Sequence, residues 1–388
     1  MEFFNSLPSL FHAFILSLAL FIQVVIGAAT NHTVVTVSPP TLPQSAATTS
    51  LPIFSVKTAS SIPAKASTKA TSTAISATKS TKPVATAVST PPAPTIQATL
   101  LPLDQLNTQT RASLVNILCT TKAGGSFEPI SGSGVIIDTR GVILTNAHVG
   151  QFFLLANYGS PGNVQCVVRT GSPATPAYTA ELLYLPPPWV EANSSQIISQ
   201  EAMGTGENDY SFLLITGPVS SGTPYPASFP ALVMNTSDPS INTNVFLAAY
   251  PAGFLGGTTI QMDLYASSAL SMVQTLYTFE NPSNVDLISL GGTVVAQSGS
   301  SGGAVINAGT GSLIGIITTE TQGTTTASRD LNAITIAHIN RSLTALGQDG
   351  IAGLLSTGNL QQEAADFNAT VAPSETQTLE AVLNKASR

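Results

Sequence analysis

The 388-residue chain has few charged residues, few histidines and almost no cysteine. Charged residues make up 9% of the sequence, and the formal net charge is −7. This balance argues against a nucleic-acid-binding protein, because an acidic surface repels a polyanion. Two cysteines and four histidines offer no pattern of metal ligands, so we expect neither a metal nor a cofactor.

The N-terminal third lacks the residues needed to build a core. Residues 10–29 form an apolar run without a charged side chain, so residues 1–29 are either a signal peptide or a membrane anchor. Residues 30–104 are rich in Ser, Thr, Ala and Pro and predict a disordered linker. We therefore expect the remaining chain to work outside the cytoplasm, either secreted or anchored to the membrane.

The remaining chain, residues 105–388, carries 8 basic and 18 acidic residues. It also contains both cysteines, Cys119 and Cys166. In an exported domain these two could form a disulfide bond, and two buried thiols are the alternative. Their spacing does not decide between the two.

The most informative motif lies at residues 296–305, with the sequence AQSGSSGGAV. Ser301 has one glycine two residues before it and two glycines directly after it. A nucleophilic hydroxyl needs such bare backbone, so that a carbonyl group can approach and meet main-chain N–H donors. This pattern indicates a catalytic serine, although Gly/Ser clusters also form ordinary loops.

Two further motifs supply the partners of such a serine. Residues 133–149 read as a β-hairpin that ends in TNAHV, and they place His148 at the end of the second strand. Asp209 stands directly before an apolar strand, and Glu207, two residues earlier, is the alternative carboxylate. We prefer Asp209, which makes the chain order His, Asp, Ser.

That order is the one found in chymotrypsin-like enzymes. The strings GSGVIID at 132–138, TNAHV at 145–149 and GSSGGA at 299–304 resemble trypsin-like serine peptidases, especially the bacterial high-temperature-requirement branch. The segments AAYPAG at 248–253 and GSLIGI at 311–316 are similar to the same branch. The resemblance covers roughly residues 106–345 and leaves no room after them for a further peptide-binding domain.

The resemblance implies an all-β fold of two barrels, with the active site in the cleft between them. It places the first barrel at about 105–220 and the second at about 221–345. We expect the C-terminal tail, residues 346–388, to form a short helix plus disordered residues. The sequence independently shows short β-rich runs separated by turn residues. These runs are residues 114–119, 135–137, 142–144, 164–168, 212–215, 245–249, 293–296 and 313–318.

By the same resemblance, the chain is a serine endopeptidase that acts on proteins or peptides. His148 would be the general base, Asp209 would fix its tautomer, and the N–H groups of Gly299 and Ser301 would form the oxyanion hole. Substrate binding falls to Val295, Ile317 and Thr318. Because Val295 carries no charge, the residue before the cleaved bond is expected to be small or apolar.

Two other functions remain open. Residues 299–303 also fit the G-x-S-x-G elbow of an α/β-hydrolase esterase, with Asp330 and His338 following in the order of that fold. The elbow requires a helix after the serine, whereas the sequence after Ser301 predicts strand, turn and strand, so we interpret His338 as structural. The third possibility is a catalytically inactive binding module on a protease-like scaffold. The sequence does not indicate an oligomeric state.

Overall fold

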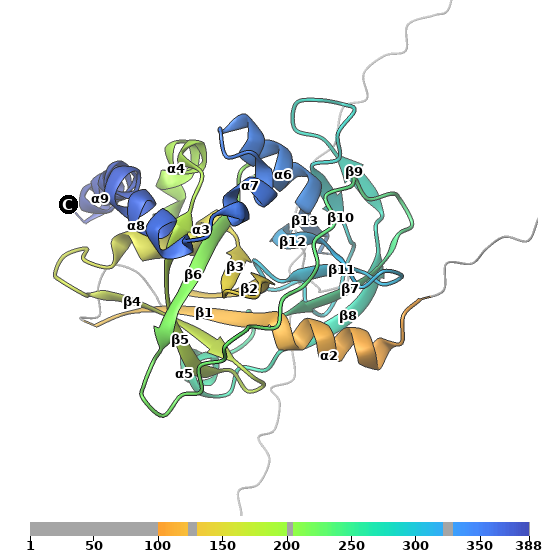
Figure 1. The fold of residues 1–388 in the computed structure, drawn as a ribbon, viewed down its shortest axis with the longest axis horizontal. Coiled ribbons are helices and arrows are strands. Elements are labelled where there is room, and N and C mark those ends of the chain that lie inside the picture. Colours follow the sequence, from red (N-terminus) through yellow and green to blue (C-terminus); the bar gives the residue numbers. More distant parts are fainter. Residues whose placement is uncertain (1–99, 123–129, 200–204, 321–328, 388) are drawn as a thin grey trace, which may run out of the picture. The chain divides into compact units, whose positions relative to one another are not determined.

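The computed structural model describes residues 100–122, 130–199, 205–320 and 329–387, which lie within one unit of the chain, Thr90–Arg388. The predicted leader and all but the end of the predicted linker fall outside these residues. The described part contains two groups of antiparallel strands (Figure 1). Within it, no helix is long and apolar enough to cross a membrane.

The first group is a closed barrel of six strands in the order β1-β2-β3-β6-β5-β4. Its strands are β1 (Leu114–Thr121), β2 (Ile130–Asp138), β3 (Val142–Thr145), β4 (Val164–Thr170), β5 (Thr175–Tyr184) and β6 (Ser211–Pro218). The predicted hairpin before His148 is confirmed as β2 and β3. Its turn is closed by a hydrogen bond from the Gly141 N–H to the Asp138 carbonyl, at 2.9 Å.

The second group is a sheet of seven strands in the order β8-β7-β11-β12-β13-β10-β9. Its strands are β7 (Asn244–Ala249), β8 (Ser267–Met272), β9 (Thr275–Tyr277), β10 (Leu287–Ser289), β11 (Ala304–Asn307), β12 (Leu313–Glu320) and β13 (Leu331–Thr335). After Ser301 the chain forms strand β11, a turn and strand β12, as the sequence predicts.

The prediction of a strand at residues 293–296 is wrong. This segment is a turn, in which the Ala296 N–H donates to the Thr293 carbonyl at 2.9 Å. The Thr293 hydroxyl accepts from the Val295 N–H at 3.1 Å. Thr and Val favour strands, but these local bonds replace the ladder bonds that a strand would need.

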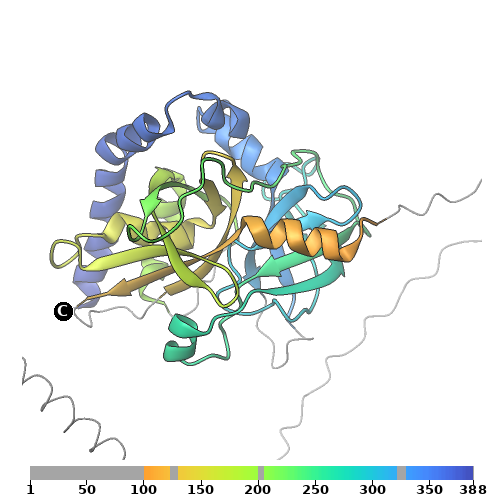
Figure 2. The same ribbon diagram turned by 60° about the horizontal axis from the view of Figure 1, so that its bottom comes forward.

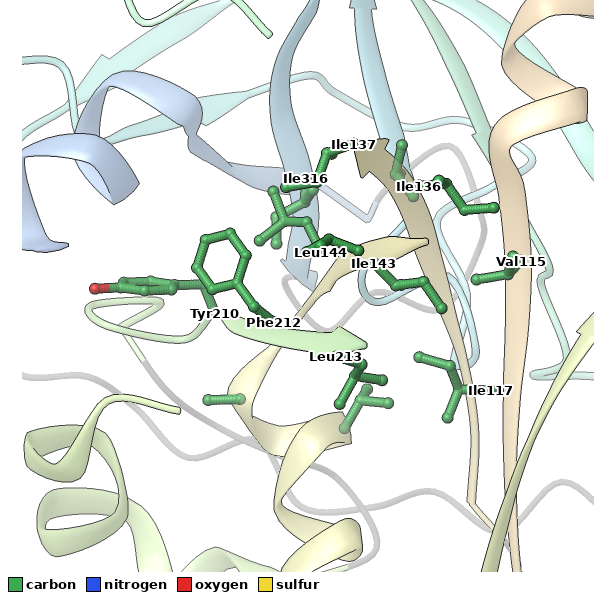
Figure 3. Packing of buried hydrophobic residues seen from close by; sticks show 14 of the residues in the cluster. Val115, Ile117, Ile136, Ile137, Ile143, Leu144, Tyr210, Phe212, Leu213 and Ile316 are labelled. Atoms are coloured by element: carbon green, nitrogen blue, oxygen red, sulfur yellow. The ribbon is translucent and has the colours of Figure 1, made fainter. Parts of the chain in front are cut away.

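Strand β7 of the second sheet is buried on both faces. Along β7, Val245, Leu247 and Ala249 belong to the sheet's own core. The alternating Phe246 and Ala248 belong to the large cluster that also fills the first barrel. Figure 3 shows part of this cluster, with Ile316 of β12 drawn among the barrel residues. A shared core therefore holds the two groups of strands together.

Helices make the fold less purely β than the sequence predicts. Helix α2 (Leu103–Ser113) contacts β1 and β2 of the barrel and β7 of the sheet. The other helical segments are α3 (Ala147–Gly150), η1 (Gln151–Leu155), α4 (Pro187–Asn193), η2 (Ser194–Ile198), α5 (Gly257–Met262), α6 (Ile336–Ala345), α7 (Gly350–Ser356), α8 (Leu360–Thr370) and α9 (Ala372–Ala386). The all-β prediction therefore holds only approximately.

The C-terminal tail is more structured than predicted. In place of a short helix followed by disordered residues, α7, α8 and α9 form an arc over the first barrel (Figure 2). Helix α8 packs on β5, and α9 packs on η1, η2 and α4. Arg140 secures the end of α7 by donating to the carbonyls of Leu355 and Thr357, both at 2.7 Å.

Cys119 and Cys166 form a disulfide bond. They lie directly opposite each other on β1 and β4, with Cα atoms 4.0 Å apart. The bond links positions separated by 47 residues, so it restricts the unfolded chain considerably.

Replacing both cysteines with alanine is expected to lower the free energy of unfolding by about 2–4 kcal/mol, because the unfolded chain regains the entropy of an open loop. Urea unfolding of the full chain measures this change. The wild-type protein under reducing conditions is the matched comparison and should lose a similar amount. Equal stability of the oxidised wild type and the double variant would contradict this assignment.

Helix α9 carries a buried carboxylic acid. Glu375 is 4% exposed, and neither of its carboxyl oxygens has a hydrogen-bond partner within the described residues. Burial raises the pKa of Glu375 from 4.5 to about 7. Between these values the folded chain binds more protons at this position than the unfolded chain does. The free energy of unfolding therefore falls as the pH rises through this window.

Replacing Glu375 with Gln should remove this loss, because an amide stays neutral at every pH in the window. We expect a Tm several degrees above wild type at pH 8 and close to wild type near pH 5, measured by thermal denaturation of the full chain. Glu363→Gln, which changes an exposed glutamate on α8, is the control. Parallel Tm profiles for Glu375→Gln and wild type between pH 5 and 8 would rule out a loss of stability caused by Glu375.

Candidate active site

The pairing of β3 with β6 brings His148 and Asp209 together. These strands run antiparallel, with Thr145 opposite Ser211. The end of β3 therefore lies beside the start of β6, and residues just beyond these positions become neighbours. His148 lies in α3, the single helical turn that follows β3, and Asp209 lies directly before the strand that begins at Ser211.

Asp209 and His148 share two hydrogen bonds. The His148 Nδ1 is 2.8 Å from Asp209 Oδ2, and the His148 backbone N–H donates to Asp209 Oδ1 at 3.0 Å. A carboxylate can only accept, so Nδ1 carries the hydrogen of this bond. In the neutral imidazole, Nε2 is then the acceptor, as a general base requires.

A residue of the second sheet completes the shell around Asp209. The Thr318 hydroxyl, on β12, donates to Asp209 Oδ2 at 2.7 Å. Asp209 is 5% exposed, and its burial alone would raise its pKa. The charge and hydrogen bonds of His148, together with the Thr318 hydroxyl, outweigh burial and hold the pKa of Asp209 below its ordinary value. The site therefore keeps Asp209 ionised.

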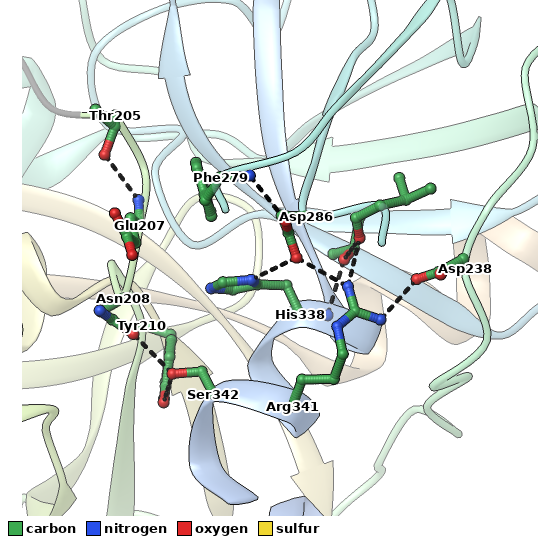
Figure 4. Close-up of polar contacts among 12 residues, drawn as sticks. Thr205, Glu207, Asn208, Tyr210, Asp238, Phe279, Asp286, His338, Arg341 and Ser342 are labelled. Atoms are coloured by element: carbon green, nitrogen blue, oxygen red, sulfur yellow. Dashed lines mark hydrogen bonds and ion pairs between the residues drawn. The ribbon is translucent and has the colours of Figure 1, made fainter. Parts of the chain in front are cut away.

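The residues on either side of Asp209 are attached to α6. The Ser342 hydroxyl donates to Asn208 Oδ1 at 2.7 Å and lies 2.8 Å from the Tyr210 hydroxyl (Figure 4). Asn208 adopts a left-handed backbone conformation with φ of 57°, and the side chain of Tyr210 is fully buried. No sequence motif indicates this support, because Ser342 lies 134 residues after Asn208.

Ser301 lies in the glycine-rich turn before β11 and is partly exposed. Gly302 has a φ of 83°, and a Cβ atom there would collide with the Ser133 carbonyl oxygen and the Thr145 hydroxyl. Only glycine fits this close approach of two backbones. The predicted need for bare backbone around Ser301 thus has a physical cause at Gly302.

The amides of Gly299 and Ser301 have no hydrogen-bond acceptor among the described residues, whereas those of Ser300, Gly302 and Gly303 do. The Ser298 carbonyl accepts from the Ala252 N–H at 2.7 Å and so does not occupy either amide. Two main-chain donors beside a serine hydroxyl are the components of an oxyanion hole.

Hydrogen bonds connect the Ser301 turn to the His148–Asp209 pair. The Ser133 N–H donates to the Ser301 carbonyl at 2.7 Å. The Gly302 N–H donates to the carbonyl of Ile317 at 2.8 Å, and the next residue, Thr318, holds Asp209. Within the described residues, the Ser301 hydroxyl itself makes no hydrogen bond to His148 or to any other group.

The predicted substrate-binding residues contribute less exposed surface than expected. Val295 and Ile317 are 0% and 2% exposed and belong to the core of the second sheet. Thr318 is buried, and its hydroxyl is committed to Asp209. The assignment of substrate binding to these three residues stays a prediction, because no substrate is present.

A second histidine–aspartate pair joins His338 of α6 to Asp286, which directly precedes β10, and within the described residues no hydrogen bond links it to Ser301. His338 Nδ1 is 2.8 Å from Asp286 Oδ1, which also accepts from Arg341 at 2.9 Å (Figure 4). Burial lowers the pKa of His338, and Asp286 opposes this shift. His338 therefore pairs with Asp286 and not with Asp330, and Ser301 is followed by strand β11 and not by the helix of an esterase elbow.

In the described part of the chain, no group of His, Cys, Asp or Glu side chains could hold a metal ion. The site itself brings four kinds of polar group together. These are an oriented imidazole, a buried carboxylate, a partly exposed hydroxyl and two free amides.

The chain was compared with known families, proteins and structures. Residues 132–316 match the protein family described as the trypsin-like peptidase domain, a range that includes His148, Asp209 and Ser301. The crystal structure of Deg5 is similar at 20% sequence identity over 63% of this chain and 94% of that chain, with a TM-score of 0.41. No curated protein matches the chain. Residues 132–316 of this protein therefore form a trypsin-like peptidase domain.

Proposed function

We propose that the protein is a serine endopeptidase with a His148, Asp209 and Ser301 triad. The observation that carries the proposal is the His148 Nδ1 to Asp209 Oδ2 bond of 2.8 Å, which orients Nε2 as a base. The free amides of Gly299 and Ser301 support it, because they provide the donors that an acyl-transfer reaction needs.

In the proposed reaction, the Ser301 hydroxyl attacks the carbonyl carbon of a peptide bond while His148 Nε2 takes its proton. The carbonyl oxygen becomes negatively charged and accepts from the amides of Gly299 and Ser301. His148 then donates the proton to the leaving amine, and water releases the acyl group by the same steps. The ionised Asp209 stabilises the positive charge that His148 carries in between.

The substrates in this proposal are proteins or peptides, cut after small or apolar residues. The support for this preference comes from the sequence alone, which has no charge at Val295, and the side chain of Val295 is buried in the core of the second sheet. The acidic character of residues 105–388 favours neutral or basic substrates over acidic ones.

We also propose that the enzyme works outside the cytoplasm, secreted or anchored through residues 1–29. The Cys119–Cys166 bond supports this location, because disulfide bonds persist mainly in oxidising compartments.

The first prediction concerns the nucleophile. A fluorophosphonate probe should label the full-length protein at Ser301, as mapped by mass spectrometry, because an activated hydroxyl displaces fluoride from phosphorus. Labelling should disappear in Ser301→Ala and in His148→Ala, and hydrolysis of an unfolded protein such as casein should disappear with it.

Two control variants test whether the effect is specific. Ser300→Ala removes a neighbouring hydroxyl that is buried and has no hydrogen-bond partner within the described residues, and it should label like wild type. His338→Ala tests the esterase alternative and should keep its reactivity if the chain stays folded. A folded wild type without labelling would instead favour a catalytically inactive binding module.

The second prediction concerns Asp209. Asp209→Asn should lower kcat by about 10³–10⁴-fold near pH 7, since a neutral amide neither fixes the productive tautomer nor stabilises a charged His148. The fold should survive, because an amide oxygen can still accept from Thr318. Kinetics with a peptide substrate measure the change.

Glu207→Gln is the matched control for this experiment, because Glu207 is exposed and lies two residues away. It should leave kcat within about twofold of wild type. A loss of kcat in Glu207→Gln comparable to that in Asp209→Asn would show that Asp209 is the wrong carboxylate for this role.

A further inference from the structure

The hydroxyl of Ser133 lies between the two halves of the domain. Ser133 is on β2 of the first barrel and is fully buried. Its hydroxyl donates to the Gly299 carbonyl at 2.8 Å and accepts from the Tyr250 N–H at 2.9 Å. Both partners belong to loops of the second sheet, 166 and 117 residues away in the chain.

The backbone of Ser133 holds the same turn at a second point. Its N–H donates to the Ser301 carbonyl at 2.7 Å, and its carbonyl accepts from the Thr145 hydroxyl at 2.7 Å. One residue of the first barrel therefore binds the carbonyls of both Gly299 and Ser301. These are the two residues whose amides would form the oxyanion hole.

The hydroxyl matters because it binds the carbonyl end of the peptide unit that joins Gly299 to Ser300. Gly299 has a φ of 89°, and glycine pays little to change its backbone angles. The neighbouring peptide units have their own partners. The Ser298 carbonyl accepts from Ala252, and the Ser300 carbonyl accepts from Gly303 at 2.8 Å. The peptide unit between them is held at both ends. Its Ser300 N–H donates to the Gln297 carbonyl at 3.1 Å, and its Gly299 carbonyl accepts from the Ser133 hydroxyl.

We propose that the Ser133 hydroxyl is a positioning residue for the oxyanion hole. It fixes the peptide between Gly299 and Ser300 so that the amides on either side converge on one point. This inference rests on the proposed function, and it adds a first-barrel side chain to a site whose donors lie in the second half of the domain.

The test compares Ser133→Ala with wild type in the full chain, with the rate of fluorophosphonate labelling at Ser301 as readout. The dependence on probe concentration separates probe binding from the chemical step. We expect the maximal labelling rate to fall by about 10- to 100-fold, less than or near the 10²–10³-fold loss of one full oxyanion donor. The half-saturating probe concentration should stay within about twofold of the wild-type value. The midpoint of the labelling rate as a function of pH should not move, because the His148–Asp209 bond is untouched.

Ser131→Ala is the matched control. Ser131 also lies on β2 and accepts a hydrogen bond, from Asn116 at 3.0 Å, but it does not contact the Ser301 turn. Its labelling rate should equal that of wild type even if its Tm falls. Equal losses of rate in both variants would overturn the proposal in favour of a general loss of stability.

A second pair isolates the hydroxyl from the shape of the side chain. Ser133→Thr and Ser133→Val differ only in a hydroxyl and a methyl group, so the threonine variant should label at least tenfold faster. Equal rates in this pair, or a Ser133→Ala variant as reactive as wild type, would overturn the inference alone. A folded wild type that does not react would overturn the proposed function and this inference with it.

Discussion

The arrangement of the site depends on one buried carboxylate. Asp209 accepts from the backbone and the imidazole of His148 on the first barrel and from Thr318 on the second sheet. A buried charge is tolerated only where it is well solvated by hydrogen bonds, so these donors must be in place when the chain is folded. Because they come from both halves of the domain, the carboxylate also sets how the two halves meet.

The shared apolar cluster and the hydrogen bonds of the Ser301 turn both hold the two halves of the domain together. Apolar residues of both halves belong to one cluster, which keeps β12 against the first barrel. At the polar end of this contact, Ser133 reaches across to the backbone of Gly299 and Ser301. Gly302 allows the close approach, because any side chain there would collide with the Ser133 carbonyl. Apolar packing sets the distance between the halves, and a few directed hydrogen bonds set the register of the site.

The helices α6, α7, α8 and α9 extend the domain without entering the site. Helix α6 supports Asp209 from outside through Ser342, and α7, α8 and α9 cover the first barrel. The buried Glu375 in α9 is a costly residue at neutral pH, because burial disfavours its charged form. The stability of the arc of helices therefore depends on pH.

The sequence by itself determined the local features of the site. The glycines around Ser301, the hairpin that ends before His148 and the position of Asp209 before β6 are all readable, because turns, strand ends and close backbone approaches depend on residues near in the chain. Seven of the eight β-rich runs lie in strands for the same reason. The exception, residues 293–296, shows that side-chain capping by Thr293 can override strand propensity.

The tertiary structure alone decided the contacts between distant segments. Neither the pairing of Cys119 with Cys166 nor the support of Asp209 by Thr318 and Ser342 follows from spacing, because each depends on strand order and packing. The sequence predicts a short helix in the tail but not the extent of α7, α8 and α9, because these helices depend on packing against distant segments such as β5, η1 and η2. Local residue patterns thus specify which groups can react, and long-range packing specifies which of them are held ready to do so.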